Sequence, residues 1–282
     1  MIRRLAVVGL GLLGGSVAKA ARERGLAREV VAVGRRMEAL TAALRERVVD
    51  RATTDLDEGV AAADFVILAT PVATIEALLP KLWPAAADGA TITDVGSTKG
   101  AIVRGAERLA ADRPLAFVGS HPMAGSELSG YEAARADLFD EALVIVTPAD
   151  RTDPGAVKRV SEFWEALGAR VSTMDPDTHD RAVAAVSHLP HLVAYALVEA
   201  VARMDSSCFD VAARGFKDAT RIAASDAHVW REIFLTNRAA LGEALAAFKA
   251  SLAELERLIA GESGAALEQE LDRIRQIRSR LE

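Results

Sequence analysis

His121 stands in the stretch VGSHPMAGSELSG, after an apolar run and ahead of a series of small residues. An imidazole titrates near neutral pH, so it can accept or donate a proton during catalysis. The small residues that follow leave room for a ligand beside the ring. A histidine after a strand is also commonly a loop residue that bonds nearby backbone, and its neighbours in the fold decide between these roles.

A second polar group, GSTKG at residues 96–100, follows the apolar run TITDV. Ser97 is a candidate hydroxyl for holding a ligand, although Ser97 or Thr98 is more commonly the cap of a helix such as the one expected from about residue 100. The ordinary role of Lys99 is that of a solvated lysine in the first turn of that helix. Thr70 ends another apolar run, FVILAT.

A glycine-rich motif ends the first strand-like run and opens a helical pattern. Its residues are Gly9, Leu10, Gly11, Leu12, Leu13 and Gly14. In a dinucleotide-binding turn the first glycine permits the tight turn, the second lets the backbone approach a pyrophosphate, and the third lets helix and strand pack closely. The helix N-terminus supplies N–H donors for the anion. Since a strand, a helix and a second strand follow in register, we interpret the motif as a dinucleotide site rather than an ordinary turn.

The end of the second strand bears on which dinucleotide binds. Sites for NAD usually carry Asp or Glu there, about 20 residues past the last glycine, whereas this chain has Gly34, Arg35 and Arg36. Loss of the acid removes repulsion toward a 2′-phosphate, and an arginine fork can bind one. The alternative is that both arginines are ordinary surface residues. We expect an NAD(P) cofactor, with these residues favouring NADP.

Short β-branched runs alternate with helical stretches through the first 175 residues, which predicts an α/β fold with a Rossmann-type, doubly wound, mostly parallel sheet. Strands are expected at residues 5–9, 30–34, 65–70, 91–95, 115–119, 142–147 and 170–174. The carboxyl ends of parallel strands meet at one edge, so the glycine motif, Thr70, Ser97 and His121 are expected there together. We expect Thr70 at this rim to contact the cofactor, and His121 to take an alcohol proton beside it.

After MDPDTHD the pattern becomes helical, with Asp175 or Asp177 as the expected cap and Pro176 in the first turn. We therefore expect a dinucleotide-binding domain at 1–174 and an all-helical domain for substrate binding and dimerisation at 175–282. A helical seam in this second domain suits an internal helix contact or a subunit interface. It comprises Leu241, Leu245, Phe248, Leu252, Leu255 and Ile259.

Two polar clusters lie in the helical part. His188 and His191 flank Pro190 on one helix face, but no acidic or cysteine ligand is close in sequence, so no metal is expected. Further along, Lys217 and Arg221 share a face if GFKDATRIAASDAHVW is helical.

Arg221 is a candidate to bind an anion in the crevice, with Trp230 as an apolar wall. In the ordinary alternative, Asp218 neutralises one of the two cations.

Whole-chain properties exclude several classes of protein. The net charge of −6 gives no support to a nucleic-acid partner. The single cysteine, Cys208, rules out an internal disulfide and fits a reducing compartment. There is no run of 18 apolar residues, and the opening MIRRLAVVGLGLLGG runs into a charged helix without a cleavage site. We expect a cytoplasmic protein that neither spans nor binds a membrane.

The ordered segments GLGLLGGS, DVGSTKG, SHPMAGSELSG, SHLPH and FKDATRIAASDAHVW resemble the prephenate dehydrogenase family, which includes arogenate and cyclohexadienyl dehydrogenases of tyrosine biosynthesis. The resemblance runs from about residue 2 to about residue 240, and the last four segments in this order are its specific part. It implies oxidative decarboxylation of prephenate or arogenate to 4-hydroxyphenylpyruvate or tyrosine, with hydride transfer to NAD(P)⁺.

The resemblance also implies roles for individual residues. His121 matches the catalytic histidine that holds the substrate hydroxyl and accepts its proton. Ser97 matches the serine that positions this hydroxyl and touches the nicotinamide, and Arg221 matches the arginine that binds a substrate carboxylate. The other pocket residues in matched segments are His188, Ser126, Glu127 and Trp230. The helical domain of the family typically forms a homodimer, which fits the seam.

The chain departs from the family pattern at the missing acid after the second strand, at Ala213-Arg214-Gly215 and at Ala219. It also ends too early for an appended regulatory domain and has no N-terminal chorismate mutase extension, so tyrosine feedback is expected only at the active site. Two other classes stay open. One is a β-hydroxyacid dehydrogenase that relies on a lysine such as Lys217, and the other is a non-catalytic NAD(P) sensor that needs only the glycine motif.

Overall fold

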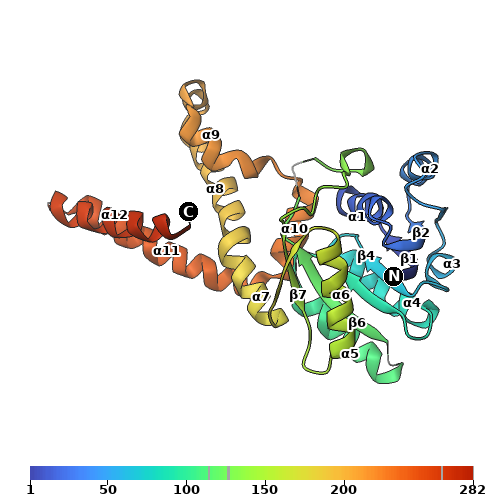
Figure 1. Cartoon of the computed structure of the whole chain (residues 1–282). Helices are drawn as coiled ribbons and strands as arrows, with labels where there is room; N and C mark the ends of the chain where they lie inside the picture. The colour runs from blue at the N-terminus through green and yellow to red at the C-terminus, as the bar shows by residue number, and fades with distance from the viewer. Residues whose placement is uncertain (114, 126–127, 262, 282) are drawn as a thin grey trace.

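The computed structural model describes residues 1–113, 115–125, 128–261 and 263–281. Within them an eight-stranded sheet carries helices on both faces, and further helices extend away from it (Figure 1). The strand order is β3-β2-β1-β4-β5-β6-β7-β8, and every neighbouring pair is parallel except β6 and β7. The predicted Rossmann-type α/β fold with a mostly parallel sheet and a helical C-terminal part is confirmed.

The strands are β1 (Ile2–Val8), β2 (Ala27–Val33), β3 (Arg51–Thr53), β4 (Phe65–Leu68), β5 (Thr91–Asp94), β6 (Ala116–Pro122), β7 (Leu143–Thr147) and β8 (Arg170–Thr173). All seven predicted strands are present, and β3 is an additional edge strand that is too short for a sequence pattern to reveal. Strand β6 continues to Pro122. His121 therefore pairs with Ile145 of β7 inside the strand, rather than following the strand as the sequence analysis placed it.

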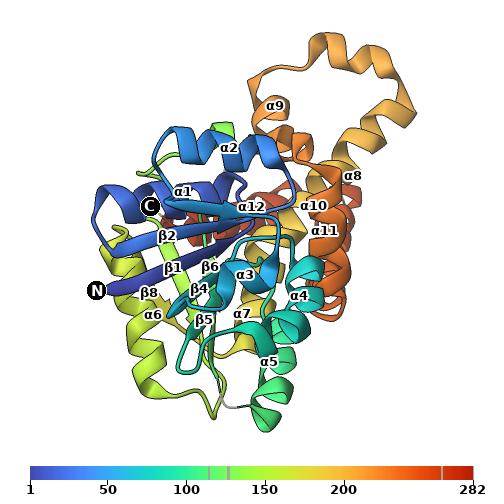
Figure 2. The same cartoon turned by 90° about the vertical axis from the view of Figure 1, so that its right-hand side faces the viewer.

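Six helices cover the sheet: α1 (Leu12–Glu23), α2 (Met37–Arg45), α3 (Leu56–Val60), α4 (Val72–Ala85), α5 (Gly100–Asp112) and α6 (Pro154–Ala166), with a short 3₁₀ turn, η1 (Tyr131–Ala133). Side chains of α1, α2 and α6 fill the core on one face, and those of α3, α4 and α5 fill it on the other (Figure 2). Along β1, Leu5 and Val7 enter the first core while Ala6 and Val8 enter the second. Burial on both faces is why these strands are continuous apolar runs.

The C-terminal part is helical throughout its described residues. Its elements are α7 (Pro176–Val183), the π turn η2 (Ala184–His188), α8 (Leu189–Met204), η3 (Ser206–Val211), α9 (Arg214–Thr220), η4 (Arg221–Ala224), α10 (Ala227–Thr236), α11 (Arg238–Ala260), α12 (Gly264–Arg278) and η5 (Ser279–Leu281). Asp175 caps α7 by accepting a hydrogen bond from the Thr178 amide at 2.9 Å, as predicted. Pro190 lacks an N–H and cannot donate to the preceding turn, and the widened π turn lies just before it.

Several helices extend away from the sheet (Figure 1). Many of their large apolar side chains are exposed. In the predicted seam, Leu241 is buried at the start of α11, whereas Leu252 and Ile259 are 54% and 70% exposed. The segment Pro176–Met204 is long and apolar enough to cross a membrane by length and composition, with a mean hydropathy of 1.3 over its most apolar window. That is weak evidence for a span, because a helix whose apolar face packs against another subunit has the same composition.

Candidate active site

The glycine motif forms a tight turn between β1 and α1 with open space above its middle glycine. Gly9 has a φ of 99°, and a Cβ there would lie 2.6 Å from the carbonyl oxygen of Ala69. A Cβ on Gly14 would lie 1.9 Å from the carbonyl oxygen of Gly9. Around Gly11, in contrast, no described atom lies within 4 Å of a Cβ position. The turn therefore has the close packing and the free approach that a dinucleotide pyrophosphate requires.

The start of α1 leaves its N–H groups for an anion. Gly11 caps this helix without a side chain, and no acidic residue lies in its first turn. The positive end of the helix dipole is thus not neutralised by the described residues around it. Leu12 and Leu13 are half-buried and pack against the apolar core, which orients the turn.

Thr70 lies beside the glycine turn at the end of β4. Its methyl group would be 2.7 Å from a Cβ on Gly9. Its hydroxyl oxygen is buried and has no hydrogen-bond partner among the described residues. A buried hydroxyl usually has a partner, so this orphaned group at the rim of the turn fits a bound cofactor.

Arg35 and Arg36 follow β2 and are both exposed. Neither side chain forms a hydrogen bond or an ion pair with another described residue, and Arg36 is the N-cap residue of α2. Both guanidinium groups are therefore accessible to a ligand at the end of β2.

His121 is buried near the end of β6, and its Nδ1 lies 2.9 Å from Nε2 of His179. Burial lowers the pKa of His121 well below its usual value, and nearby His179, Lys99 and His188 add to the effect. The imidazole is consequently neutral at pH 7 and able to accept a proton.

Lys99 is fully buried rather than solvated, which corrects the ordinary role expected of it. Its ammonium contacts the buried carboxylate of Asp94 and donates to the carbonyl oxygen of Ser120 at 2.9 Å. Burial raises the pKa of Asp94 and lowers that of Lys99, while the contact between the two charges opposes both shifts. Because Ser120 immediately precedes His121, this pair ties the loop carrying Ser97 to the strand carrying the histidine.

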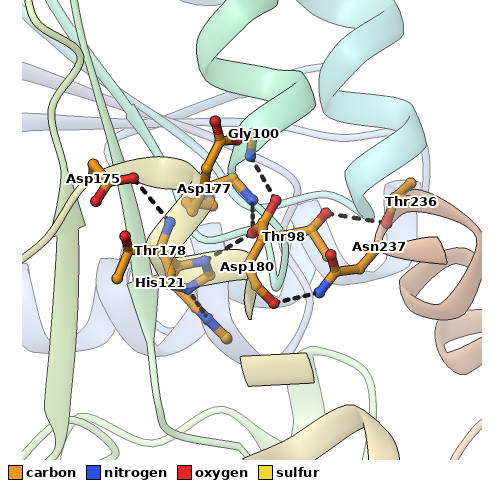
Figure 3. Close-up of polar contacts among 12 residues, drawn as sticks. Thr98, Gly100, His121, Asp175, Asp177, Thr178, Asp180, Thr236 and Asn237 are labelled. Carbon is orange, nitrogen blue, oxygen red and sulfur yellow. Dashed lines mark hydrogen bonds and ion pairs between the residues drawn. The ribbon is translucent and has the colours of Figure 1, made fainter. Parts of the chain in front are cut away.

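Helix α5 is capped from the helical part of the chain and not by Ser97 or Thr98 (Figure 3). The Asp180 carboxylate accepts hydrogen bonds from the amides of Lys99 and Gly100 at 2.8 and 2.9 Å. The Thr98 hydroxyl instead donates to that of Thr236 on α10 at 3.1 Å. Ser97 remains half-buried in the loop between β5 and α5, free of the capping role.

His188 and Trp230 lie next to each other in the helical part, with ring centroids 6.0 Å apart. His188 is almost fully buried, and Nδ2 of Asn237 lies 3.1 Å from its Nδ1. Burial lowers the pKa of His188 to about 4, so this ring is also neutral. His191 stacks on Trp230 with centroids 3.4 Å apart.

Burial lowers the pKa of His191, and the hydrogen bond to the Ser187 carbonyl opposes this shift. Arg221 is exposed at the start of η4 and lies close enough to His191 to lower that pKa slightly further. Helix α9 ends at Thr220, so Lys217 and Arg221 do not share a regular helix as expected. Asp218 pairs with Arg214 at 3.2 Å instead of neutralising either cation.

Of the other residues expected to line the pocket, Ser126 and Glu127 lie outside the described residues. Sequence reasoning missed His179, Asp180 and Asn237. The segment MDPDTHD signalled only a helix start, and its last two residues prove to contact the loop after β5 and His121. The adjacent pair His179 and Asp180, just after the predicted domain boundary, was the one sequence feature that could have indicated these contacts.

The site thus joins a dinucleotide-type turn, a neutral buried imidazole and an exposed arginine. The described residues contain no group of three or more histidine, cysteine or carboxylate side chains arranged to hold a metal. Such a set of groups can accept a proton and bind an anionic substrate beside a hydride acceptor.

Two family models match successive parts of the chain. The nucleotide-binding domain of prephenate dehydrogenase matches residues 17–173, and the dimerization domain of prephenate dehydrogenase matches residues 175–273.

Individual proteins agree with these models. A prephenate dehydrogenase from Bacillus subtilis (strain 168) is 38% identical over 82% of this chain, which spans 63% of that relative, just under two thirds of its length. A crystal structure of prephenate dehydrogenase from A. aeolicus, in complex with hydroxyphenyl propionate and NAD⁺, is 36% identical with a TM-score of 0.93 and covers 100% of this chain and 99% of its own. Synechocystis arogenate dehydrogenase is 31% identical with a TM-score of 0.86, covering 99% and 100%. By its sequence and its fold, the chain belongs to the prephenate dehydrogenase family.

Proposed function

We propose that the chain oxidises and decarboxylates prephenate or arogenate, with hydride transfer to a nicotinamide cofactor, in tyrosine biosynthesis. One observation carries the proposal: a buried, neutral His121 lies at the same sheet edge as a glycine turn that is open above Gly11. The names of the similar proteins support the substrate class.

In this mechanism the bound cofactor supplies the hydride acceptor. His121 accepts the proton of the ring hydroxyl, and Ser97 orients that hydroxyl from the loop between β5 and α5. The ring carbon that bears the hydroxyl loses its hydride, the bond to the ring carboxylate breaks, and its electron pair makes the ring aromatic as carbon dioxide leaves. The ring oxygen then takes the proton back from His121 to give the phenol. Aromatisation provides the driving force, so the protein mainly orients the reactants and removes one proton.

The substrate carboxylates need positive charge more than a metal. Arg221 is exposed beside His191 and is the proposed partner of a substrate carboxylate, because a guanidinium binds carboxylates with two parallel hydrogen bonds. His188 and Trp230 form the proposed wall next to it, with Ser126 and Glu127 as further members in the segment after His121.

The cofactor contacts in this proposal are the glycine motif, Thr70, Ser97 and the two arginines after β2. Arg35 and Arg36 are exposed without described partners, and no acid stands at the end of β2, which favours NADP over NAD. Kinetics with both cofactors test this. In Arg35→Ala we expect KM for NADP to rise several-fold while KM for NAD is unchanged, and an equal effect on both would contradict the preference.

The proposal also covers the organisation of the protein. We assign residues 1–174 to cofactor binding and 175–282 to substrate binding and a homodimer, because β8 ends at Thr173 and α7 begins at Pro176. A dimer would cover the apolar side chains exposed on the long helices. The reaction needs no membrane, and we place the protein in the cytoplasm.

The decisive experiment is a side-by-side assay with prephenate or arogenate, each with NAD⁺ or NADP⁺, monitored by the absorbance of the reduced nicotinamide. We expect turnover of at least one substrate, with the matching aromatic product identified by chromatography. Absence of turnover with all four pairs, while the cofactor still binds, would favour a non-catalytic sensor. Turnover of 3-hydroxy acids alone would favour a β-hydroxyacid dehydrogenase.

A further inference from the structure

A chain of three side chains runs from the start of α5 to the candidate base. Oδ1 of Asp180 lies 2.9 Å from Nδ1 of His179, and Nε2 of His179 lies 2.9 Å from Nδ1 of His121. His179 is fully buried, and its ring meets that of His121 edge to face with centroids 5.1 Å apart. Both hydrogen-bonding atoms of His179 are therefore engaged inside the protein.

The direction of these hydrogen bonds follows from the Asp180 carboxylate. Burial alone would raise the pKa of Asp180, but hydrogen bonds from His179 and the amides of Lys99 and Gly100 bring it below its usual value. An ionised carboxylate only accepts, so Nδ1 of His179 must carry a hydrogen.

The positions of the hydrogens on the other ring nitrogens follow from this one. A His179 ring that carries one hydrogen, held on Nδ1 by Asp180, presents an unprotonated Nε2 toward His121. Nδ1 of His121 must then donate the hydrogen bond, because two unprotonated nitrogens would otherwise face each other at 2.9 Å. This leaves Nε2 as the basic nitrogen of His121.

We propose that His179 is a positioning residue that, together with Asp180, holds His121 in the tautomer protonated on Nδ1 and so makes Nε2 the base. This inference rests on the proposed function for its catalytic meaning. When the proton of the substrate hydroxyl moves to Nε2, the resulting imidazolium keeps its Nδ1 hydrogen bond to His179. Its charge then faces the Asp180 carboxylate through the second ring.

Other titratable groups also face the two histidines. Lys99 from the loop after β5 and His188 from η2 both lower the pKa of His121, and neither can accept its Nδ1 hydrogen in the observed contacts. Among the described contacts, His179 is the acceptor for that hydrogen.

The tautomer is measured directly by long-range ¹H–¹⁵N NMR on ¹⁵N-histidine-labelled protein without substrate. The chain has five histidines, and His121→Asn identifies the signals of residue 121. We expect a protonated Nδ1 and an unprotonated Nε2 for His121 at pH 7. The reverse assignment would overturn the inference, whatever the enzyme turns over, so this result is distinguishable from a failure of the proposed function.

Asp180→Asn keeps the shape of the side chain and removes its negative charge. Oδ1 of Asp180 accepts from both the Lys99 amide and Nδ1 of His179, so we expect the asparagine oxygen to stay at that position and its NH2 group to face the Gly100 amide. The His121 tautomer should then be kept, and kcat should fall about 10-fold because the imidazolium loses the facing carboxylate, with KM for the cofactor unchanged. Wild-type kcat would contradict the part of the proposal that gives the Asp180 charge a role.

Two variants at position 179 separate positioning from a structural role. His179→Leu removes the acceptor, so the Nδ1 hydrogen of His121 is no longer held in place and kcat should fall about 10-fold or more. His179→Gln offers an amide oxygen in place of Nε2 and should recover part of the loss. His228→Gln, at an exposed histidine on α10, is the matched control and should change neither kcat nor the His121 tautomer. Equal losses in the Leu and Gln variants, tracking their thermal stability alone, would reduce His179 to a structural residue.

Discussion

The sheet and its six helices bury two apolar clusters of their own, whereas the long helices after α7 bury few side chains within the chain. The one buried residue of each is Ala194 on α8, Ile233 on α10 and Leu241 on α11, and α9 and α12 have no buried residue. Burial of apolar surface is the main stabilising contribution to a fold. The sheet half therefore has apolar cores of its own, while the long helices need a partner surface to be covered.

The candidate site divides in the same way. His121, Lys99 and Asp94 are buried under the sheet edge, where burial controls their ionisation. Arg221 is exposed on a short turn of the helical half. The groups proposed to transfer the proton are therefore enclosed by the protein, whereas the arginine proposed to bind the substrate carboxylate lies on a more exposed surface. Changes in the first region should affect kcat, and changes in the second should affect assembly or KM.

The largest effect is expected from His121→Asn, which tests whether the buried half supplies the base. Asparagine cannot take the substrate proton, so kcat should fall by about 10²–10⁴-fold, the usual contribution of a general base. Affinity for the cofactor, measured by fluorescence titration, should stay nearly unchanged because the ring does not form the glycine turn. A variant with wild-type kcat would show that His121 is not the base, and that the buried half of the site does not supply the proton-transfer chemistry.

The second effect concerns the exposed seam of α11. The double variant Leu252→Glu and Ile259→Glu introduces two carboxylates per protomer, and so four into the proposed dimer surface, where each is expected to cost about 1 kcal/mol. The dimer dissociation constant should rise about 10³-fold, as measured by sedimentation velocity. Met37→Glu, at a 55% exposed position on α2, is the matched control and should leave the mass unchanged. An intact dimer in the double variant would show that the interface lies elsewhere.

A smaller effect is expected from Arg221→Ala. Loss of a charge-assisted hydrogen bond to a substrate carboxylate costs about 1.5–3 kcal/mol, so KM for the substrate should rise about 10–100-fold in initial-rate measurements, with a smaller change in kcat. Arg214→Ala, at an exposed arginine paired with Asp218, serves as the control. If both variants gave equal KM values, the exposed half would not grip the substrate through Arg221.

The sequence patterns were sufficient where structure depends on neighbours in the chain. Apolar runs such as FVILAT predicted all the long strands, and the glycine spacing predicted a turn whose first glycine needs a positive φ. Strand β3 was missed because three edge residues carry no periodic pattern. The predicted meeting of Thr70 with the glycine turn followed from parallel topology alone.

The contacts that prepare the site could not be predicted in this way. Lys99 follows a serine and a threonine in a helix start and is exposed by every local rule, yet it is buried against Asp94 and Ser120. The cap of α5 comes from Asp180, about 80 residues further along the chain. Only the three-dimensional arrangement of two distant segments brings such groups together, so a single sequence holds no direct signal of them.

The Asp180 cap has a consequence for how the protein divides. The chain changes character at residue 175, but helix α5 of the sheet half is completed by a side chain from beyond that point. A chain cut after β8 would lose this cap, and the first turn of α5 would fray together with the loop that carries Ser97 and Lys99. The change in sequence pattern at residue 175 therefore does not divide the chain into two parts that are each stable alone. Through this cap, the helical half holds the loop between β5 and α5 in place.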